Sequence, residues 1–236
     1  MDYKEERFLS FYNEYRECFT VLNQMMKAGR FSQEYARGGC TIHRGFYCPS
    51  PVLDIITGGN DRGHLVHKSK SSIPFDYLYL KADNKLKIVD KYVRHCDSTS
   101  HLYQREFIID NGEETVAPIY RMVSNQHDLF FLSMCNYDSA GRIMQYLTFL
   151  PGYSSTGAKF VIDKSVCLFY GEQYFYDEET GLLESVLSGQ KMNGCASEYA
   201  YRFYHDPSGH LVSYQHIGNG EDSPLIIIPK KKQRIV

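Results

Sequence analysis

Phe175-Tyr176-Asp177-Glu178-Glu179-Thr180-Gly181-Leu182-Leu183 is the stretch of sequence that decides the fold. It places two aromatic residues before an aspartate, polar residues after it, and a glycine ahead of two leucines. An aspartate at the start of a turn accepts hydrogen bonds from the backbone amides just ahead of it, and glycine tolerates the left-handed backbone that closes a bulged hairpin. The stretch therefore predicts the tip of a β-hairpin.

Two further segments have the same order of residue types: Asn136-Tyr137-Asp138-Ser139-Ala140-Gly141-Arg142-Ile143 and Phe203-Tyr204-His205-Asp206-Pro207-Ser208-Gly209-His210-Leu211. Weaker copies lie upstream at Asp61-Arg62-Gly63, Asp83-Asn84-Lys85 and Asp110-Asn111-Gly112. Successive aspartates are 22, 27, 28, 39 and 29 residues apart. A hairpin of two ordinary strands with its connections occupies about that length. The spacing predicts an antiparallel meander of about ten strands or more over residues 61–229.

The beginning of the chain has a helical period instead. Large hydrophobic residues recur every three or four positions, at Phe8, Tyr12, Tyr15, Phe19, Leu22 and Met26, with charged residues between them and Gly29 as a suitable end. Residues 1–30 are expected to form one amphipathic helix packed on a sheet. A membrane-surface helix fits less well, because acidic and basic residues balance in this segment and such helices are usually rich in Lys and Arg.

The remaining segments complete the expected architecture. Glycine pairs and prolines interrupt residues 31–60, which predicts a loop-rich connection with one short strand at 52–56, and residues 230–236 form a basic tail. The 20 Tyr and 14 Phe suit pleated, half-buried strands. The expected class is α+β, mostly β, in a single domain over residues 1–236: the N-terminal amphipathic helix packs on a long twisted antiparallel β-meander of hairpin units.

The three strong aromatic-Asp-Gly segments resemble the tyrosine-aspartate repeats of the bacterial RHS family. More loosely, they are similar to the repeat-built immunity proteins and antitoxins that accompany polymorphic toxins. With the weaker copies, the resemblance covers about two thirds of the chain. The spacing is irregular and the many tandem copies of an RHS toxin shell are missing, so the resemblance implies a small accessory protein rather than a shell.

Motifs that could carry chemistry are incomplete. Cys40, His43 and Cys48 have ligand types that zinc accepts, or could form a thiol with a base, but no second ligand pair follows at the usual spacing. The segment 152–157 does not match the Gly-x-Ser-x-Gly elbow, and 58–63 lacks the Lys-Ser/Thr ending of a phosphate loop. No catalytic residue, metal ion or cofactor is expected.

Charge is distributed unevenly along a chain whose formal net charge is only −2. Residues 171–222 contain nine acidic and two basic side chains, whereas residues 61–105 contain nine basic and five acidic ones. Such a field can steer an oppositely charged partner, so a protein with a basic surface is expected and nucleic acid is not. The charged start and the lack of a long apolar run indicate a cytoplasmic protein with no membrane partner and with reduced cysteines.

The aromatic surplus and the lack of a catalytic signature favour a binding module. We expect an immunity or antitoxin-like inhibitor that neutralises a bacterial toxin domain by covering its active site. The candidate contact residues are Tyr137, Tyr176, Asp177, Glu178, Glu179 and Tyr204. Two alternatives stay open: a hydrolase or metal-dependent enzyme using Cys40, His43 and Cys48, and a repeat-built structural or assembly component.

Overall fold

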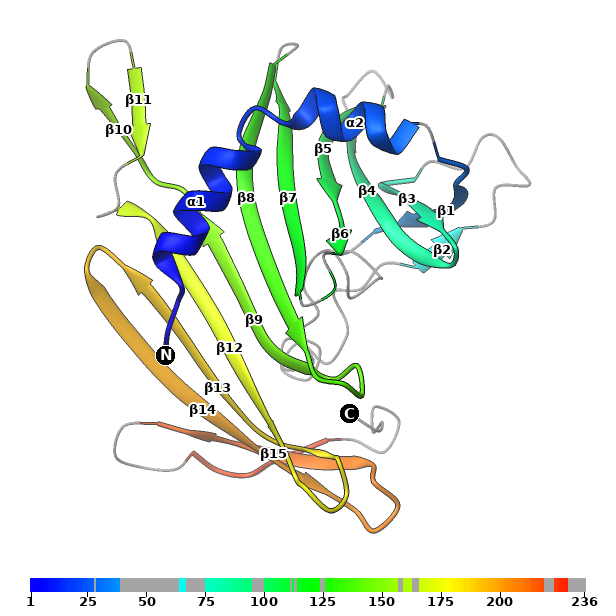
Figure 1. Cartoon of the computed structure of the whole chain (residues 1–236). Helices are drawn as coiled ribbons and strands as arrows, with labels where there is room; N and C mark the ends of the chain where they lie inside the picture. The colour runs from blue at the N-terminus through cyan, green and yellow to red at the C-terminus, as the bar shows by residue number, and fades with distance from the viewer. Residues whose placement is uncertain are drawn as a thin grey trace. The chain divides into compact units, whose positions relative to one another are not determined.

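The computed structural model describes residues 1–27, 29–38, 64–66, 75–94, 100–110, 112, 114–123, 126–156, 159–162, 166–218 and 223–228 (Figure 1). The chain divides into two compact units. The N-terminal unit comprises residues 4–49 and 59–134, and the C-terminal unit comprises residues 1–3, 50–58 and 135–236. The single-domain organisation expected from the sequence stays a prediction.

The elements of the N-terminal unit are α1 (Glu5–Tyr15), α2 (Phe19–Lys27), β1 (Ser32–Arg37), β2 (His64–Val66), β3 (Tyr77–Ala82), β4 (Lys85–Arg94), β5 (Ser100–Phe107), β6 (Ile109–Asp110) and β7 (Glu114–Val123). Strand β8 (Gln126–Tyr137) crosses the boundary. The C-terminal unit contains β9 (Ile143–Leu150), β10 (Tyr153–Thr156), β11 (Lys159–Ile162), β12 (Leu168–Tyr176), β13 (Leu183–Met192), β14 (Cys195–His205), β15 (Leu211–Ile217) and β16 (Ile226–Ile227).

One antiparallel sheet contains all of these strands except β10 and β11. Its order is β16-β15-β14-β13-β12-β9-β8-β7-β5-β4-β3-β1-β2, with β6 paired to β7. Most neighbours in space are therefore neighbours in sequence, as a meander of hairpins requires. The mostly β, antiparallel α+β class predicted from the sequence is confirmed at this level.

The separate hairpin of β10 and β11 explains the longest spacing in the repeat. It lies between β9 and β12, which pair with each other from Gln145 to Leu150. The two aspartates 39 residues apart, Asp138 and Asp177, therefore enclose one hairpin more than their neighbours do.

Two helices form where the sequence predicted one over residues 1–30. The backbone ladder is interrupted after Tyr15, whose carbonyl oxygen accepts a hydrogen bond from the Cys18 amide at 3.0 Å and another from the Tyr120 hydroxyl at 2.5 Å. The α-helical acceptor for the Phe19 amide is thus already occupied, which is a local reason for the break. The hydrophobic period still predicts burial correctly at Phe8, Tyr12, Phe19 and Leu22.

An ion pair and an aromatic cluster hold α2 within the N-terminal unit. The Arg105 guanidinium donates to both Asp90 carboxylate oxygens at 2.6 Å and to Asn23 Oδ1 of α2 at 2.5 Å. Asp90 is 1% exposed. Burial of the Arg105 side chain disfavours its charged form, but the hydrogen bonds and the charge of Asp90 raise the pKa of Arg105 overall. The Phe19 ring packs edge-on against Phe107 and Tyr120.

Turn chemistry is confirmed at two of the weaker sequence copies. Asp83 and Asn84 both have positive φ, at 50° and 59°, and join β3 to β4 in a two-residue turn. The Gly112 amide donates to Asp110 Oδ1 at 3.0 Å. The copy at 61–63 lies outside the described residues. A further turn, Asn193-Gly194, joins β13 to β14 and was not among the predicted tips, although Asn-Gly is a strong hairpin signal.

Strand β1 also differs from expectation, because it lies inside the segment 31–60 that was predicted to be loop-rich. It pairs with β3 over Ser32–Ala36, and its Ala36 joins a small core with Tyr77, Tyr79 and Val89. Turn residues dominate only the later part of that segment. The predicted strand at 52–56 and the basic tail at 230–236 lie outside the described residues.

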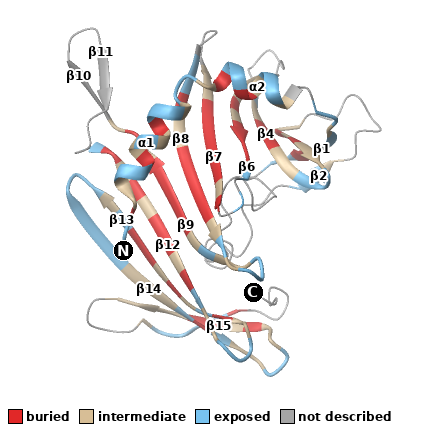
Figure 2. Cartoon of the chain, viewed as in Figure 1, coloured by how far each residue is buried: buried red, intermediate tan, exposed pale blue. Residues whose placement is uncertain are grey.

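The core of the C-terminal unit covers one face of β12 to β15. Its buried members are Cys135, Tyr146, Tyr174, Leu183, Val186, Phe203, Leu211, Tyr214 and Ile228 (Figure 2). Among the described residues, no helix is long and apolar enough to cross a membrane.

Two glycines receive the first residues of the chain on the other face. Gly171 of β12 and Gly189 of β13 are directly paired. A Cβ on Gly171 would lie 2.5 Å from Met1 Sδ, and one on Gly189 would lie 2.6 Å from Tyr3 Oη. The Met1 amino group forms an ion pair with Glu198, which is opposite Gly189 on β14. The missing side chains therefore make the space that residues 1–3 occupy.

We expect Arg105→Met to lower the free energy of unfolding by about 3–5 kcal/mol, because it leaves the Asp90 carboxylate buried without its guanidinium. Urea unfolding measures this loss. The double variant Arg105→Met/Asp90→Leu should recover most of it, since it removes the buried charge as well. A single variant as stable as the wild type would show that the ion pair does not stabilise α2.

Candidate partner-binding surface

Three hairpin tips lie at the same end of the C-terminal unit. They join β8 to β9, β12 to β13, and β14 to β15, and the neighbouring strands are antiparallel throughout. Every second turn of a meander falls at the same end, so the turn between β13 and β14 lies at the opposite end. We call residues 136–143, 175–183 and 203–211 the tip row. These are the three strong motifs of the sequence.

Each tip is built around its aspartate. In the first, Asp138 Oδ1 accepts from the amides of Ala140 at 2.9 Å and Arg142 at 2.8 Å. The Gly141 amide donates to the Asp138 carbonyl at 3.0 Å, and Gly141 has φ of 77°. The hydrogen bonds to the Asp138 carboxylate hold its pKa below the usual range. The bond from the Arg142 amide has the largest effect.

The other two tips repeat this arrangement. Asp177 Oδ1 accepts from the Thr180 hydroxyl and amide, each at 2.7 Å, and Asp206 Oδ1 accepts from the amides of Ser208 at 2.8 Å and His210 at 3.0 Å. Both carboxyl groups consequently have a lowered pKa, caused mainly by Thr180 at Asp177 and by the His210 amide at Asp206. The predicted role of the aspartates in the turns is confirmed.

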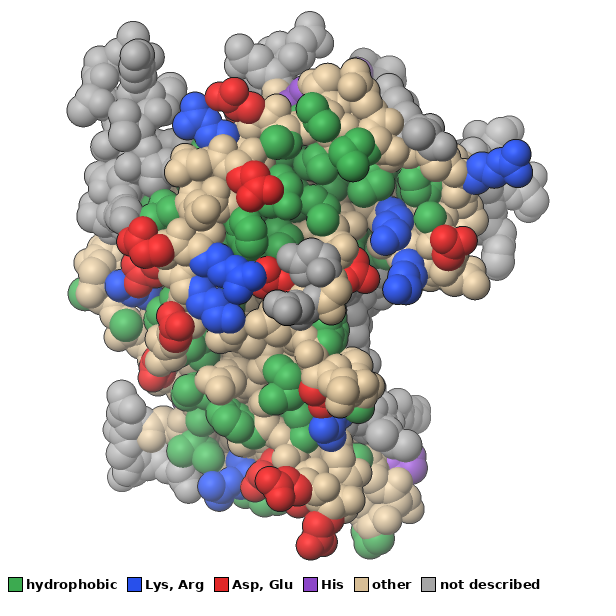
Figure 3. Space-filling view, in the orientation of Figure 1, with side chains coloured by type: hydrophobic (Ala, Val, Ile, Leu, Met, Phe, Trp, Pro, Cys, Tyr) green, Lys and Arg blue, Asp and Glu red, His purple; other side chains and the backbone are tan. Residues whose placement is uncertain are grey.

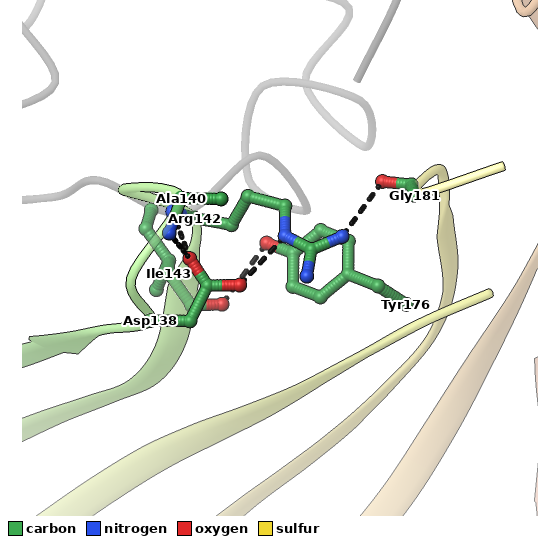
Figure 4. A network of polar contacts seen from close by, with 6 residues as sticks. All are labelled: Asp138, Ala140, Arg142, Ile143, Tyr176 and Gly181. Atoms are coloured by element: carbon green, nitrogen blue, oxygen red, sulfur yellow. Dashed lines mark hydrogen bonds and ion pairs between the residues drawn. The ribbon is translucent and has the colours of Figure 1, made fainter. Parts of the chain in front are cut away.

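Arg142 joins the first tip to the second (Figure 4). Its Nε donates to Asp138 Oδ2 at 2.7 Å and its Nη1 to the Gly181 carbonyl at 3.3 Å. Its guanidinium lies 4.6 Å from the centre of the Tyr176 ring, and the Tyr176 hydroxyl donates to the Ile143 carbonyl at 2.9 Å. Two neighbouring turns are therefore fixed to each other by one side chain.

The third tip continues the row. A Cβ on Gly209 would lie 3.6 Å from a methyl group of Leu182, so the second and third turns are in contact distance at these residues. Gly209 has φ of 81°, the left-handed value predicted for its place in the turn. The three tips thus form one continuous structure.

The row brings together only part of the predicted contact set. Glu178 and Glu179 are exposed, and Figure 3 shows acidic side chains at this end of the unit. Tyr137 is 37% exposed. Asp177 is engaged in its own turn, and Tyr176 is half-buried beneath Arg142 against the core. Glu178, Glu179, Tyr137 and Tyr204 are the members of the set that remain accessible.

Tyr204 lies on the opposite face of the sheet. It follows the core residue Phe203, and its hydroxyl donates to Gln215 Oε1 at 3.1 Å. Sequence analysis missed Phe175, which is 42% exposed on the face that Tyr204 occupies. Phe175 follows the buried Tyr174 and therefore lies on the other face of β12. The sequence does not show which face is buried, because this strand has aromatic residues on both.

The acidic count of residues 171–222 overstates the surface charge. Glu172 is 1% exposed; its carboxylate accepts from the Tyr170 hydroxyl at 2.5 Å and from the Tyr174 hydroxyl. The Ser188 hydroxyl donates to Tyr170 Oη at 3.0 Å. The alternating sequence Tyr170-Gly171-Glu172-Gln173-Tyr174 placed these three side chains on one face, but nothing in it showed that this face is buried.

This buried group affects the tyrosines around it. Burial, with smaller contributions from Tyr199, Tyr214 and Glu172, raises the pKa of Tyr201 to about 12. Burial, followed by Glu172, also raises the pKa of Tyr170. Both phenols therefore stay neutral at physiological pH, and the Tyr170 hydroxyl donates to Glu172.

The described residues contain no group of three or more His, Cys, Asp and Glu placed to hold a metal ion. Cys40, His43 and Cys48 lie outside them. Burial raises the pKa of the Cys135 thiol to about 12, so it is a core side chain rather than a reactive thiolate.

Comparisons with known proteins identify no family. No protein-family model matches the chain, and no curated protein matches it. A crystal structure of a protein of unknown function from Bacteroides fragilis is similar over 69% of this chain and 97% of that one, with 10% identity and a TM-score of 0.34.

Gly141→Ala should lower the free energy of unfolding by about 1–2 kcal/mol, because alanine is strained at φ of 77°. Apart from its chain neighbours, no atom of the described residues lies within 4 Å of the added Cβ, so the cost comes from the backbone conformation. Gly141→Asn is the matched control and should lose less, since asparagine tolerates this conformation. Equal stability of both variants and the wild type in urea unfolding would contradict the left-handed turn.

Acid should destabilise the tip row. The folded-state pKa values of Asp138, Asp177 and Asp206 are lowered, so their contribution is complete above the unfolded value near ~3.9 and is lost as pH falls through the folded values. The triple Asp→Asn variant should show a shallower decline of unfolding free energy below about pH 4. Exposed Asp128 on β8 provides the control as Asp128→Asn, and an unchanged slope in the triple variant would refute this assignment.

Proposed function

We propose that the chain is a cytoplasmic, protein-binding inhibitor of the immunity-protein or antitoxin type. It neutralises a bacterial toxin domain by covering the active site of that domain. The tip row is the contact surface, and the helices of the N-terminal unit support the meander by packing on its sheet. The Tyr120–Tyr15 bond and the Phe19 cluster support this packing.

One observation carries the proposal: neighbouring turns are fixed to each other while acidic side chains on them stay exposed. Arg142 bonds to both Asp138 and Gly181, so the second turn is held from outside as well as by Asp177. Glu178 and Glu179 extend from that turn into solvent. A surface ordered before binding loses less conformational entropy on association, which favours tight binding.

The chemistry of the exposed groups indicates the partner. Adjacent carboxylates form strong, charge-assisted hydrogen bonds with Arg and Lys, the residues with which enzymes bind phosphate groups. A toxin domain with a basic active site would offer such residues. Tyr137 adds a large contact area at low entropic cost, in the manner of tyrosines at binding surfaces. We therefore propose a partner whose basic substrate-binding surface is masked by the tip row.

Charge reversal tests the proposal. The chain is co-expressed with each toxic protein encoded beside its gene, and growth is measured. The wild type should restore growth, and Glu178→Lys/Glu179→Lys should weaken binding at least about tenfold, or ~1.4 kcal/mol, because like charges then meet.

A matched control is available on the N-terminal unit. Glu14→Lys/Glu17→Lys changes the net charge equally at exposed positions and should protect as the wild type does. The proposal fails if no neighbouring toxic protein is neutralised, or if the tip variant protects as well as this control.

A further inference from the structure

Strand β14 extends beyond its outer neighbour. It spans Cys195–His205, but β15 pairs with it only from Ala200 onward. Residues 195–199 pair with β13 on the inner side, through an unbroken register from Met192↔Cys195 to Ser188↔Tyr199. Figure 2 shows this end of the hairpin as exposed, and residues 195–198 are exposed individually. The described part of the chain thus leaves an open sheet edge here.

The turn fixes which backbone groups face that edge. Asn193 and Gly194 have φ of 54° and 74°, the values of a type I′ turn. Such a turn is closed by a hydrogen bond from the residue after it to the residue before it, so the Cys195 amide faces β13. Direction alternates along an antiparallel strand. The N–H and C=O groups of Ala196 and Glu198 therefore face outward.

Within the described residues, this edge shows none of the usual protection against strand pairing. Natural edges are blocked by lysine, proline, bulges or covering segments. Here Ala196 and Ser197 are small and uncharged, no bulge interrupts the register, and the carboxylate of Glu198 pairs with the Met1 amino group. An extended backbone is the ligand that this edge can satisfy.

We propose that a second copy of the chain adds to this edge, antiparallel, with Ser197 opposite Ser197 of the second copy. In this register the outward N–H and C=O groups of Ala196 face those of Glu198 in the second copy. Glu198 of the first copy faces Ala196 of the second in the same way, so both pairs can form their two hydrogen bonds. The two Glu198 carboxylates are each opposite an alanine rather than each other. The backbone groups of the edge are therefore complementary to those of a second copy, and no like charges lie directly opposite each other.

This self-association is distinct from the proposed inhibitor function. The edge adjoins the turn between β13 and β14, at the end of the unit opposite the tip row, so a dimer leaves the tips available. A contact of one short strand pair is far below the ~1,200 Å² of a stable interface. The dimer is accordingly weak and forms as concentration rises.

Sedimentation equilibrium over a wide concentration range tests the edge. The average mass of the wild type should rise with concentration. Ala196→Pro removes the outward N–H and should stay monomeric, whereas Ala196→Val keeps the N–H and should associate as the wild type does. Both variants should fold, because the Ala196 amide takes no part in the pairing with β13. Circular dichroism checks this.

Cross-linking tests the register independently. Residues opposite each other in a non-hydrogen-bonded pair have Cα atoms ~4.5 Å apart, a distance that a disulfide can span. Ser197→Cys should form a covalent dimer on oxidation, and Ala196→Cys, whose opposite residue is Glu198, should form far less. A wild type that is monomeric at every concentration, association by Ala196→Pro, or equal cross-linking of both cysteine variants would overturn the proposal.

Discussion

At the three tips of the tip row the chain can reverse because an aspartate carboxylate satisfies the backbone amides that the reversal exposes. At a tip the strands part and the turn amides lose their ladder partners, so an acceptor must be supplied locally. Asp138, Asp177 and Asp206 supply it, and a glycine in the left-handed region completes each turn. The geometry of each turn helps to fix the register of the two strands that it joins, and the register decides which side chains lie on the buried face.

The turns built by these aspartates also hold the side chains of the proposed binding surface. The aspartates that build the turns are not available to a partner, but they determine where the side chains beside them point. Arg142 extends this order from one turn to the next, and its place over Tyr176 removes one tyrosine from the surface while leaving Glu178 and Glu179 outside. Rigidity and accessibility at the tips therefore come from different residues of the same motif.

The sequence predicts those features that depend on neighbours along the chain. The turns at Asp138, Asp177 and Asp206, the meander they imply and the burial of Phe8 and Phe19 all follow from local spacing. The exposed glutamates of the second tip follow from it too.

Features that depend on distant residues could not be predicted in this way. The helix break depends on Tyr120, which donates to Tyr15 from a strand 105 residues away. The burial of Glu172 and the exposure of Phe175 depend on which face of β12 the core covers, and tyrosines at both parities conceal it. The bond from Arg142 to Gly181 requires that two turns be adjacent in space.

The glycine pair beneath residues 1–3 has a consequence for the order of folding. Met1 contacts Glu198, 197 positions later in the chain. Residues 1–3 are synthesised before β12, β13 and β14, so they cannot dock until these strands have formed. Closing so large a loop is entropically slow. The docking of this segment therefore follows the formation of the three strands.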